Sequence, residues 1–376
     1  MSKGGRLDVV QVLRFVAASL VVVAHAESRL ARVFAEHAES TVIFALGHLR
    51  TWGHFGVDLF FAISGFIMYW VTRGRFQRSG ASLDFLRKRV VRVVPIYWGL
   101  TAFAVGLLAV APSLFSYRES LDTQWIAASF LFVPWQAPEG FVAPVLGLGW
   151  TLNYEVWFYL CFALLLLLPE RRALPTITIA FVACALLGQL VVFENPWTRQ
   201  ATSWLLLEFV MGLWIAHAYT SRTFYTAKLA RVIGPLGLVA LFATIFFDPA
   251  PAAGEVSNNG LRFLAWGIPS AAVLFGALSL HWQPSGSRFG RVLVALGDAS
   301  YSIYLLQVFA LPGIARVLAA MHLDAWLPFD VLVLLLTAGS IAVGYVFYLL
   351  VERPLTRALQ RRGHAVTAPT TSTVAA

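Results

Sequence analysis

The segment Arg14–His25 reads RFVAASLVVVAH. Between the cation at its start and the imidazole at its end, every side chain is apolar or small. In a helix each residue turns the chain by about 100° and advances it by about 1.5 Å. Arg14 and His25, eleven residues apart, therefore lie on one face, about 16 Å apart along the axis. The segment therefore predicts a buried or membrane helix that carries one polar group at each end of the same stripe.

The composition of the whole chain is that of a membrane protein. Of its 376 residues, 59% are hydrophobic and 12% are charged, with a mean hydropathy of +0.73, whereas a soluble chain carries about 25% charged residues. The two cysteines, Cys161 and Cys184, lie in apolar runs without metal-site spacing, so neither a disulfide framework nor a metal site is expected. The net charge of +9 arises from cations clustered between apolar segments, which indicates membrane topology and not nucleic-acid binding.

Ten apolar segments are long enough to span a bilayer. They cover residues 8–26, 54–72, 92–111, 148–168, 174–193, 200–219, 232–248, 260–280, 295–320 and 329–351. An eleventh, WIAASFLFVPW at 125–135, is too short to span, and we expect it to be re-entrant or interfacial. The expected fold is an all-α polytopic membrane domain, residues 1–356, followed by a cytoplasmic tail, 357–376, which its polar composition predicts to be disordered.

The distribution of basic residues predicts the orientation. With the N-terminus inside, 20 of the 28 Lys and Arg residues fall in inner segments and 5 in outer loops, which places both termini in the cytoplasm. The other three, Arg14, Arg262 and Arg316, lie within spans. The basic N-terminus and the AHA before Glu27 also resemble a cleaved signal peptide, an alternative that Arg14 disfavours because it interrupts the apolar region.

Ionisable groups gather at the outer ends of three spans. His25 ends the first apolar segment, and HFGVDLFFAISGF at 54–66 places His54 and Asp58 at the same level. GWTLNYEVWFYL at 149–160 places Glu155 one to two turns below that surface. Because a carboxylate can orient a histidine and stabilise its imidazolium form, we expect His25 to be a general base with Asp58 and Glu155 nearby. The alternative for His25 is an interfacial histidine without a catalytic role.

A basic run marks the inner start of the third span. FLRKRVVRVVPIYW at 85–98 contains Arg89 and Arg92, which are three residues apart and share a helix face. They are either anchors of membrane topology or a clamp for phosphate, which guanidinium groups bind in bidentate fashion. For Arg14, two turns above the same surface, the alternatives are contact with headgroups or with a partner inside the protein.

Six motifs occur in an order that resembles the membrane acyltransferase-3 family. They are the Arg14–His25 pair, GVDLFFAISGF, Arg89-x-x-Arg92 with VPIYW, WTLNYEVWFY, LGDASYSIYLLQ at 296–307 and VERP at 351–354. The resemblance implies transfer of acyl groups from acyl-CoA to hydroxyls, mostly on surface or exported polysaccharides. It also implies that Arg14 and His25 are essential and that Arg89 and Arg92 bind acyl-CoA. Gln307 departs from the pattern, because many members have histidine at that position.

The combined expectation is an O-acyltransferase of the bacterial cytoplasmic membrane. It would move an acyl group, most simply acetyl, from acyl-CoA, a co-substrate and not a resident cofactor, to a carbohydrate hydroxyl. The coenzyme phosphates would lie at Arg89 and Arg92, and the pantetheine arm would pass Arg14 towards His25. The alternative is a transporter or flippase for a glycan or lipid-linked intermediate, which intramembrane Arg and His would also suit, although no inverted repeat is visible.

Overall fold

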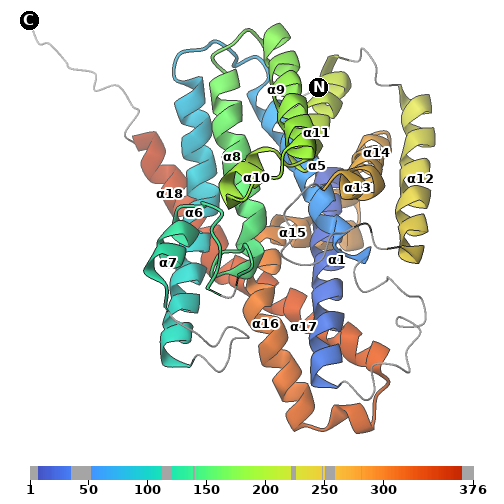
Figure 1. Ribbon diagram of the computed structural model, residues 1–376. Coiled ribbons are helices and arrows are strands. Elements are labelled where there is room, and N and C mark those ends of the chain that lie inside the picture. Colours follow the sequence, from blue (N-terminus) through green and yellow to red (C-terminus); the bar gives the residue numbers. More distant parts are fainter. Residues whose placement is uncertain are drawn as a thin grey trace, which may run out of the picture.

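The computed structural model describes residues 7–34, 52–111, 121–138, 140–221, 226–247, 249, 259–280 and 282–365. Within these residues the chain is helical, with one isolated bridge between Gln136 and Val142 and no strand (Figure 1). Nine helices of the described chain are long and apolar enough to cross a membrane. The prediction of an all-α polytopic membrane protein is confirmed.

The longer helices follow the apolar segments of the sequence. They are α1 Asp8–Val33, α5 Phe55–Thr72, α6 Ala81–Val110, α8 Trp150–Leu165, α9 Glu170–Leu190, α11 Leu206–Ser221, α12 Ala227–Ala243, α14 Ile268–Ala277, α16 Ser300–Ala320 and α17 Phe329–Phe347. Short helices connect or extend them: α7 Thr123–Phe130, α10 Pro196–Ala201, α13 Gly260–Arg262, α15 Arg288–Asp298 and α18 Arg353–Ala365. Two π-helical turns, η4 Phe263–Gly267 and η7 Tyr348–Glu352, interrupt the last third of the chain.

The predicted spans differ from these helices in three places. The predicted span 148–168 forms α8, whose 16 residues cover only about 24 Å, less than the hydrocarbon core of a bilayer. The predicted span 295–320 is two helices, α15 and α16, separated at Ala299. The third predicted span begins at Ala81 and not at residue 92, so the whole basic run 87–92 is helical.

The segment 125–135 is a short helix followed by a turn. α7 ends at Phe130, and Phe132 has a left-handed backbone with φ of 57°. Tyr97 and Trp98 of α6 donate hydrogen bonds to the carbonyls of Ser129 and Phe130, at 3.1 and 2.8 Å. These bonds fix α7 against α6, and its re-entrant position in a bilayer stays a prediction.

Helix α5 lies between α1 and α11 at very short backbone distances. A Cβ on Gly56 would lie 2.4 Å from the carbonyl oxygen of Ala17 in α1. On the opposite side, a Cβ on Gly65 would lie 1.9 Å from the Phe209 oxygen, and one on Gly212 would lie 2.0 Å from the Ala62 oxygen. Glycine at these positions lets the helices touch backbone to backbone, as small residues do in membrane helix pairs. Helix α1, which carries both Arg14 and His25, also packs on α15, α16 and α17.

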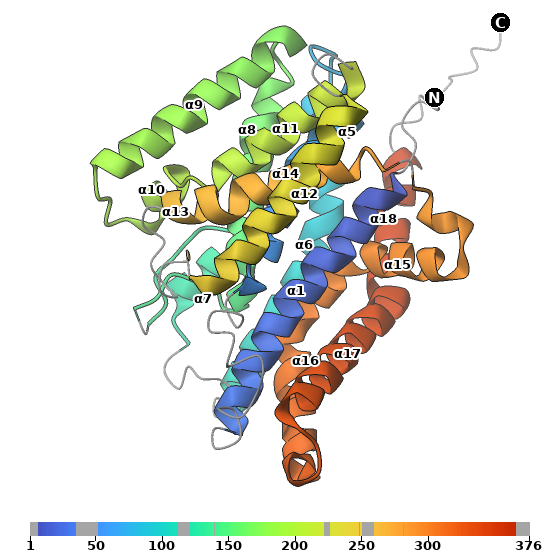
Figure 2. The ribbon, with the colours of Figure 1, turned by 90° about the vertical axis from the view of Figure 1, so that its right-hand side faces the viewer.

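Helix α15 runs across the bundle, whereas the long helices run along it (Figure 2). In both views (Figures 1 and 2), the start of α1 and the end of α18 lie towards the same end of the molecule. Helix α18 continues to Ala365, so the prediction of disorder is wrong for residues 357–365, where Leu, Ala, Gln and Arg favour a helix. The rest of the predicted tail lies outside the described residues, and the position of the domain boundary at residue 356 stays a prediction.

Candidate active site

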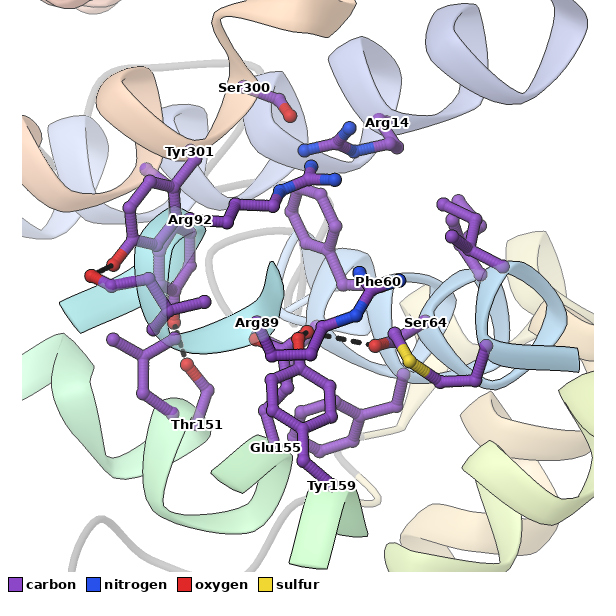
Figure 3. A pocket seen from close by; sticks show the side chains of 18 residues that line it. Arg14, Phe60, Ser64, Arg89, Arg92, Thr151, Glu155, Tyr159, Ser300 and Tyr301 are labelled. Atoms are coloured by element: carbon purple, nitrogen blue, oxygen red, sulfur yellow. Dashed lines mark hydrogen bonds between the residues drawn. The ribbon is translucent and has the colours of Figure 1, made fainter. Parts of the chain in front are cut away.

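Five helices enclose a cavity in the middle of the bundle, with a volume of about 90 Å³. Helices α1, α5, α6, α8 and α16 contribute its lining residues (Figure 3). The polar ones are Arg14, Ser64, Arg89, Arg92, Thr151, Glu155, Tyr159, Ser300, Tyr301 and Tyr304. The apolar lining comes mainly from one face of α5, from Val57 to Met68, a length of about 16 Å along the helix.

Three arginines from two helices point into this cavity. Arg14 of α1 and Arg89 of α6 are buried, with exposed fractions of 8% and 9%, and Arg92 is half-buried. The guanidinium groups of Arg14 and Arg92 lie close together, and that of Arg89 lies apart from them towards Ser64 (Figure 3). Arg92 repels both Arg14 and Arg89 electrostatically. The neighbouring Arg87 and Lys88 are exposed. The basic run therefore divides into two cations that line the cavity and two that face outwards.

The arginines of the cavity have few partners within the protein. Arg14 Nη1 donates to Gln11 Oε1 at 3.2 Å, and Arg89 Nε has no hydrogen-bond acceptor. The Arg89 guanidinium lies beside aromatic rings, 5.3 Å from the centre of Phe85 and 5.7 Å from that of Tyr159. An excess of positive charge therefore faces the cavity.

Glu155 is the carboxylate among the lining residues. Its Oε1 accepts hydrogen bonds from Ser64 Oγ at 2.8 Å and from the Tyr159 hydroxyl. Glu155 is an electrostatic neighbour of Arg14 and Arg89, but no ion pair joins it to either. The structure thus places Glu155 among the arginines of a cavity that His25 does not line, and its expected role beside His25 stays a prediction.

Asp58, the second predicted carboxylate, has an arginine as its partner. It is fully buried and forms a bidentate ion pair with Arg262, Nε to Oδ1 at 3.1 Å and Nη2 to Oδ2 at 2.9 Å. The Arg262 guanidinium lies 5.3 and 5.8 Å from the ring centres of Trp266 and Trp150, and Glu208 lies next to the pair. Asp58 thus pairs with Arg262 of α13, which is in turn an electrostatic neighbour of His54. The expected place of Asp58 near His25 stays a prediction.

His25 contacts a second histidine instead. The rings of His25 and His54 meet edge to face, with their centres 5.2 Å apart. His25 Nδ1 lies 2.8 Å from the carbonyl oxygen of Val21. Because a carbonyl can only accept, Nδ1 carries the hydrogen, and in the neutral ring Nε2 keeps the free lone pair that a base needs. His54 precedes α5 by one residue, so it lies one turn from Val57, where the cavity ends.

Sequence reasoning missed the partners of the two carboxylates. Arg262 was recognisable as a cation within an apolar span, but its pairing with Asp58 needs the fold. Ser64 and Tyr159 carry no charge, so no signal in the sequence distinguished them as the residues that hold Glu155.

A comparison with protein families identifies the chain. The acyltransferase-3 family model, which describes an acyltransferase domain, matches residues 7–349. The chain belongs to the acyltransferase-3 family.

Several characterised relatives agree with this family. The exopolysaccharide production protein ExoZ of Rhizobium meliloti is 34% identical, over 86% of this chain and 95% of the relative. The acyltransferase MdmB of Streptomyces mycarofaciens is 27% identical, over 98% of this chain and 96% of the relative. The O-acetyltransferase OatA of Staphylococcus aureus is 23% identical, over 67% of this chain but only 45% of the relative. No solved structure matches the chain significantly.

Membership of the acyltransferase-3 family confirms the interpretation as an enzyme, in preference to a transporter or flippase. At the position where many acyltransferase-3 members have histidine, Gln307 is buried, and its Nε2 donates to the Tyr304 carbonyl at 2.9 Å. Its Oε1 has no hydrogen-bond partner, and Gln307 does not line the cavity. The side chain is therefore held by its own helix and not by the cavity residues.

Proposed function

We propose that this protein transfers an acyl group, most simply acetyl, from acyl-CoA to a hydroxyl of an exported or surface polysaccharide, in the cytoplasmic membrane of a bacterium. The observation that carries the proposal is the cavity, where Arg14, Arg89 and Arg92 meet with one carboxylate, Glu155, which is already bonded to hydroxyl groups. Buried cations without paired acids are costly unless an anion joins them. Coenzyme A supplies several phosphates, and guanidinium groups bind phosphate in bidentate fashion.

The shape of the cavity suits a long, thin donor. From Met68 to Val57 it follows α5 for about 16 Å, and it ends one turn from His54, which contacts His25. A coenzyme with its phosphates at the arginines could extend its pantetheine arm along this face, which would bring the thioester towards the two histidines. The cations gathered at Arg14, Arg89 and Arg92 and the apolar wall that runs along α5 both support this direction.

The chemistry assigned to His25 follows from its hydrogen bond to Val21. Nε2 takes the proton of the acceptor hydroxyl, whose oxygen attacks the thioester carbonyl. The new C–O bond forms as the C–S bond breaks, and the imidazolium returns the proton to the coenzyme sulfur. A two-step route, in which the imidazole itself is acylated first, would give an acyl-enzyme that can be trapped without acceptor.

The acceptor class rests on the relatives. ExoZ is named for exopolysaccharide production and OatA for O-acetyl transfer, and both share the family with this chain. A polysaccharide hydroxyl is the acceptor that best fits both names.

The first test replaces His25. Purified protein with labelled acetyl-CoA and surface glycans should lose at least about 10²-fold in turnover in His25→Ala, because the proton acceptor is gone. The control is His322→Asn, an exposed histidine with φ of 51°, a backbone region that Asn tolerates. Near-normal turnover by a folded His25→Ala protein would overturn the assignment.

The second test concerns the direction of transfer. The basic bias places Arg89 and Arg92 at the inner side and His25 in the outer half of α1. Sealed vesicles of known orientation should therefore acylate an outer acceptor when acyl-CoA is supplied inside. Acylation that requires acyl-CoA on the outer side alone would contradict this arrangement.

A further inference from the structure

A groove on the surface of the bundle lies between α15 and α17, and it shares no lining residue with the cavity described above. Helix α15 contributes Arg288, Arg291, Val292, Ala295 and Leu296, and α17 contributes Ala338, Ile341, Ala342 and Tyr345. Helix α15 crosses the bundle near one end of α17 (Figure 2), and side chains of both helices line the groove. The groove is therefore a separate feature from the proposed acyl-transfer site.

The floor of the groove is apolar. Ala338 and Ala342 are four residues apart on α17, so their small side chains lie on one stripe, and both are exposed. Ile341 and Tyr345 lie beside this stripe, and Val292 of α15, which is 55% exposed, borders it from above. An apolar groove of this kind fits a hydrocarbon chain that lies along α17.

The mouth of the groove is strongly positive. Arg288 and Arg291 are three residues apart on α15 and are both exposed. Arg291 Nη1 donates to the Ser285 carbonyl at 3.2 Å, and neither guanidinium forms an ion pair with an acid in the described part of the chain. Both arginines lie in the first turns of α15, where the helix dipole already disfavours cations and attracts anions. Two cations at the positive end of a helix favour a bound anion.

We propose that this groove binds an anionic phospholipid from the bilayer. Its phosphate lies between Arg288 and Arg291, and one acyl chain lies along the Ala338–Ala342 stripe. A zwitterionic lipid fits less well, because its ammonium group would be repelled by the two arginines. A free phosphate compound lacks the chain that the apolar floor would cover.

The lipid would act on the helix that leads into the cavity. Helix α15 ends at Asp298, and the next helix begins at Ser300, which lines the cavity together with Tyr301. At its far end α15 is already fixed, since a Cβ on Gly297 would lie 2.0 Å from the Gln11 oxygen of α1. A lipid bound to Arg288 and Arg291 would fix the opposite end of α15, where the helix begins.

Lipid retention by the purified protein tests the site without any acyl transfer. The protein in detergent is mixed with equal amounts of phosphatidylglycerol and phosphatidylcholine of the same chain length, and the bound lipid is counted by mass spectrometry of the intact complex. The native protein should retain phosphatidylglycerol preferentially. Arg288→Gln/Arg291→Gln should lower that retention about tenfold or more, because each basic contact with an anionic lipid is lost.

Two further variants separate charge from shape. Arg171→Gln/Arg172→Gln removes two exposed cations at the start of α9 and should leave retention unchanged. Ala342→Trp fills the floor, keeps both arginines, and should lower retention of phosphatidylglycerol severalfold. The proposal is wrong if the native protein retains both lipids equally, if the α9 variant loses as much lipid, or if glycerol 3-phosphate displaces the lipid at equal concentration.

Discussion

Buried arginines occur in two contrasting environments of this molecule. Arg262 has a bidentate carboxylate partner, Asp58, in a closed cluster with Glu208. Arg14, Arg89 and Arg92 share an open cavity in which no carboxylate pairs with them. The first group has its counter-charges built into the chain as an ion pair. The second has acids in its vicinity, among them Glu155 and Glu352, but no ion pair with them among the described residues.

This difference separates structural charge from charge reserved for a ligand. A buried pair is costly to break, because either partner is left without compensation. A cluster of like charges gains free energy only when an opposite charge arrives from outside. Sequence composition treats all four arginines alike, whereas their surroundings assign them different tasks.

The largest effect on stability is expected from the loss of Arg262. Arg262→Leu leaves Asp58 and Glu208 together without a cation, so the free energy of unfolding should fall by about 3–5 kcal/mol. Denaturation in detergent, followed by tryptophan fluorescence, measures this change. The double variant Arg262→Leu/Asp58→Asn removes both ends of the pair and should recover at least half of the loss; a single variant as stable as the native protein would refute the structural role.

Arg92 should show the opposite behaviour. Arg92→Ala relieves repulsion with Arg14 and Arg89, so the stability should not fall, but acyl-CoA affinity should drop about tenfold to a hundredfold as charge-assisted hydrogen bonds are lost. Arg92→Lys should recover only part of this affinity, since lysine lacks the forked geometry. The measurement is KM for acyl-CoA against KM for acceptor, and an equal change in both would argue against a donor site.

The smallest effect is expected on the outward side of the same helix. Arg87→Gln/Lys88→Gln alters two exposed cations, of which Lys88 pairs with Asp84 at 2.7 Å. Exposed pairs of this kind contribute only a few tenths of a kcal/mol, so acyl-CoA affinity should change less than about twofold. A loss comparable to that of Arg92→Ala would mean that the run binds the donor as a diffuse positive patch and not through the cavity.

The sequence predicts the membrane class and most helices because hydropathy is a local property of consecutive residues. Hydropathy does not give the length of a helix or the position of a break. The sequence predicted a full span where α8 has 16 residues, and one span where the chain forms two helices separated at Ala299. A continuous apolar pattern does not show that the chain turns, since both arms remain apolar.

The candidate site is predictable in part. Arg89 and Arg92 both line the cavity, as helix periodicity predicts for residues three apart. Arg14, which the sequence placed farther along the path of the donor, lines the same cavity. The carboxylates could not be assigned, because depth along a span leaves rotation about its axis open. Asp58 and Glu155 were placed at a plausible depth, but each turns to a different neighbour from His25.

The glycines of α5 set a limit on how the donor cavity can respond to what enters it. With Gly56 closed against α1 and Gly65 against α11, the backbone of α5 touches both neighbouring helices directly at these two positions. One side of that helix forms the apolar wall of the cavity, from Val57 to Met68. This wall therefore cannot move outwards. A bulkier acyl chain fits only if side chains of α6, α8 or α16 move instead. Residues of those three helices would then determine which acyl chains the enzyme accepts. Replacing either glycine with alanine would push α5 towards the cavity and restrict the enzyme to smaller donors.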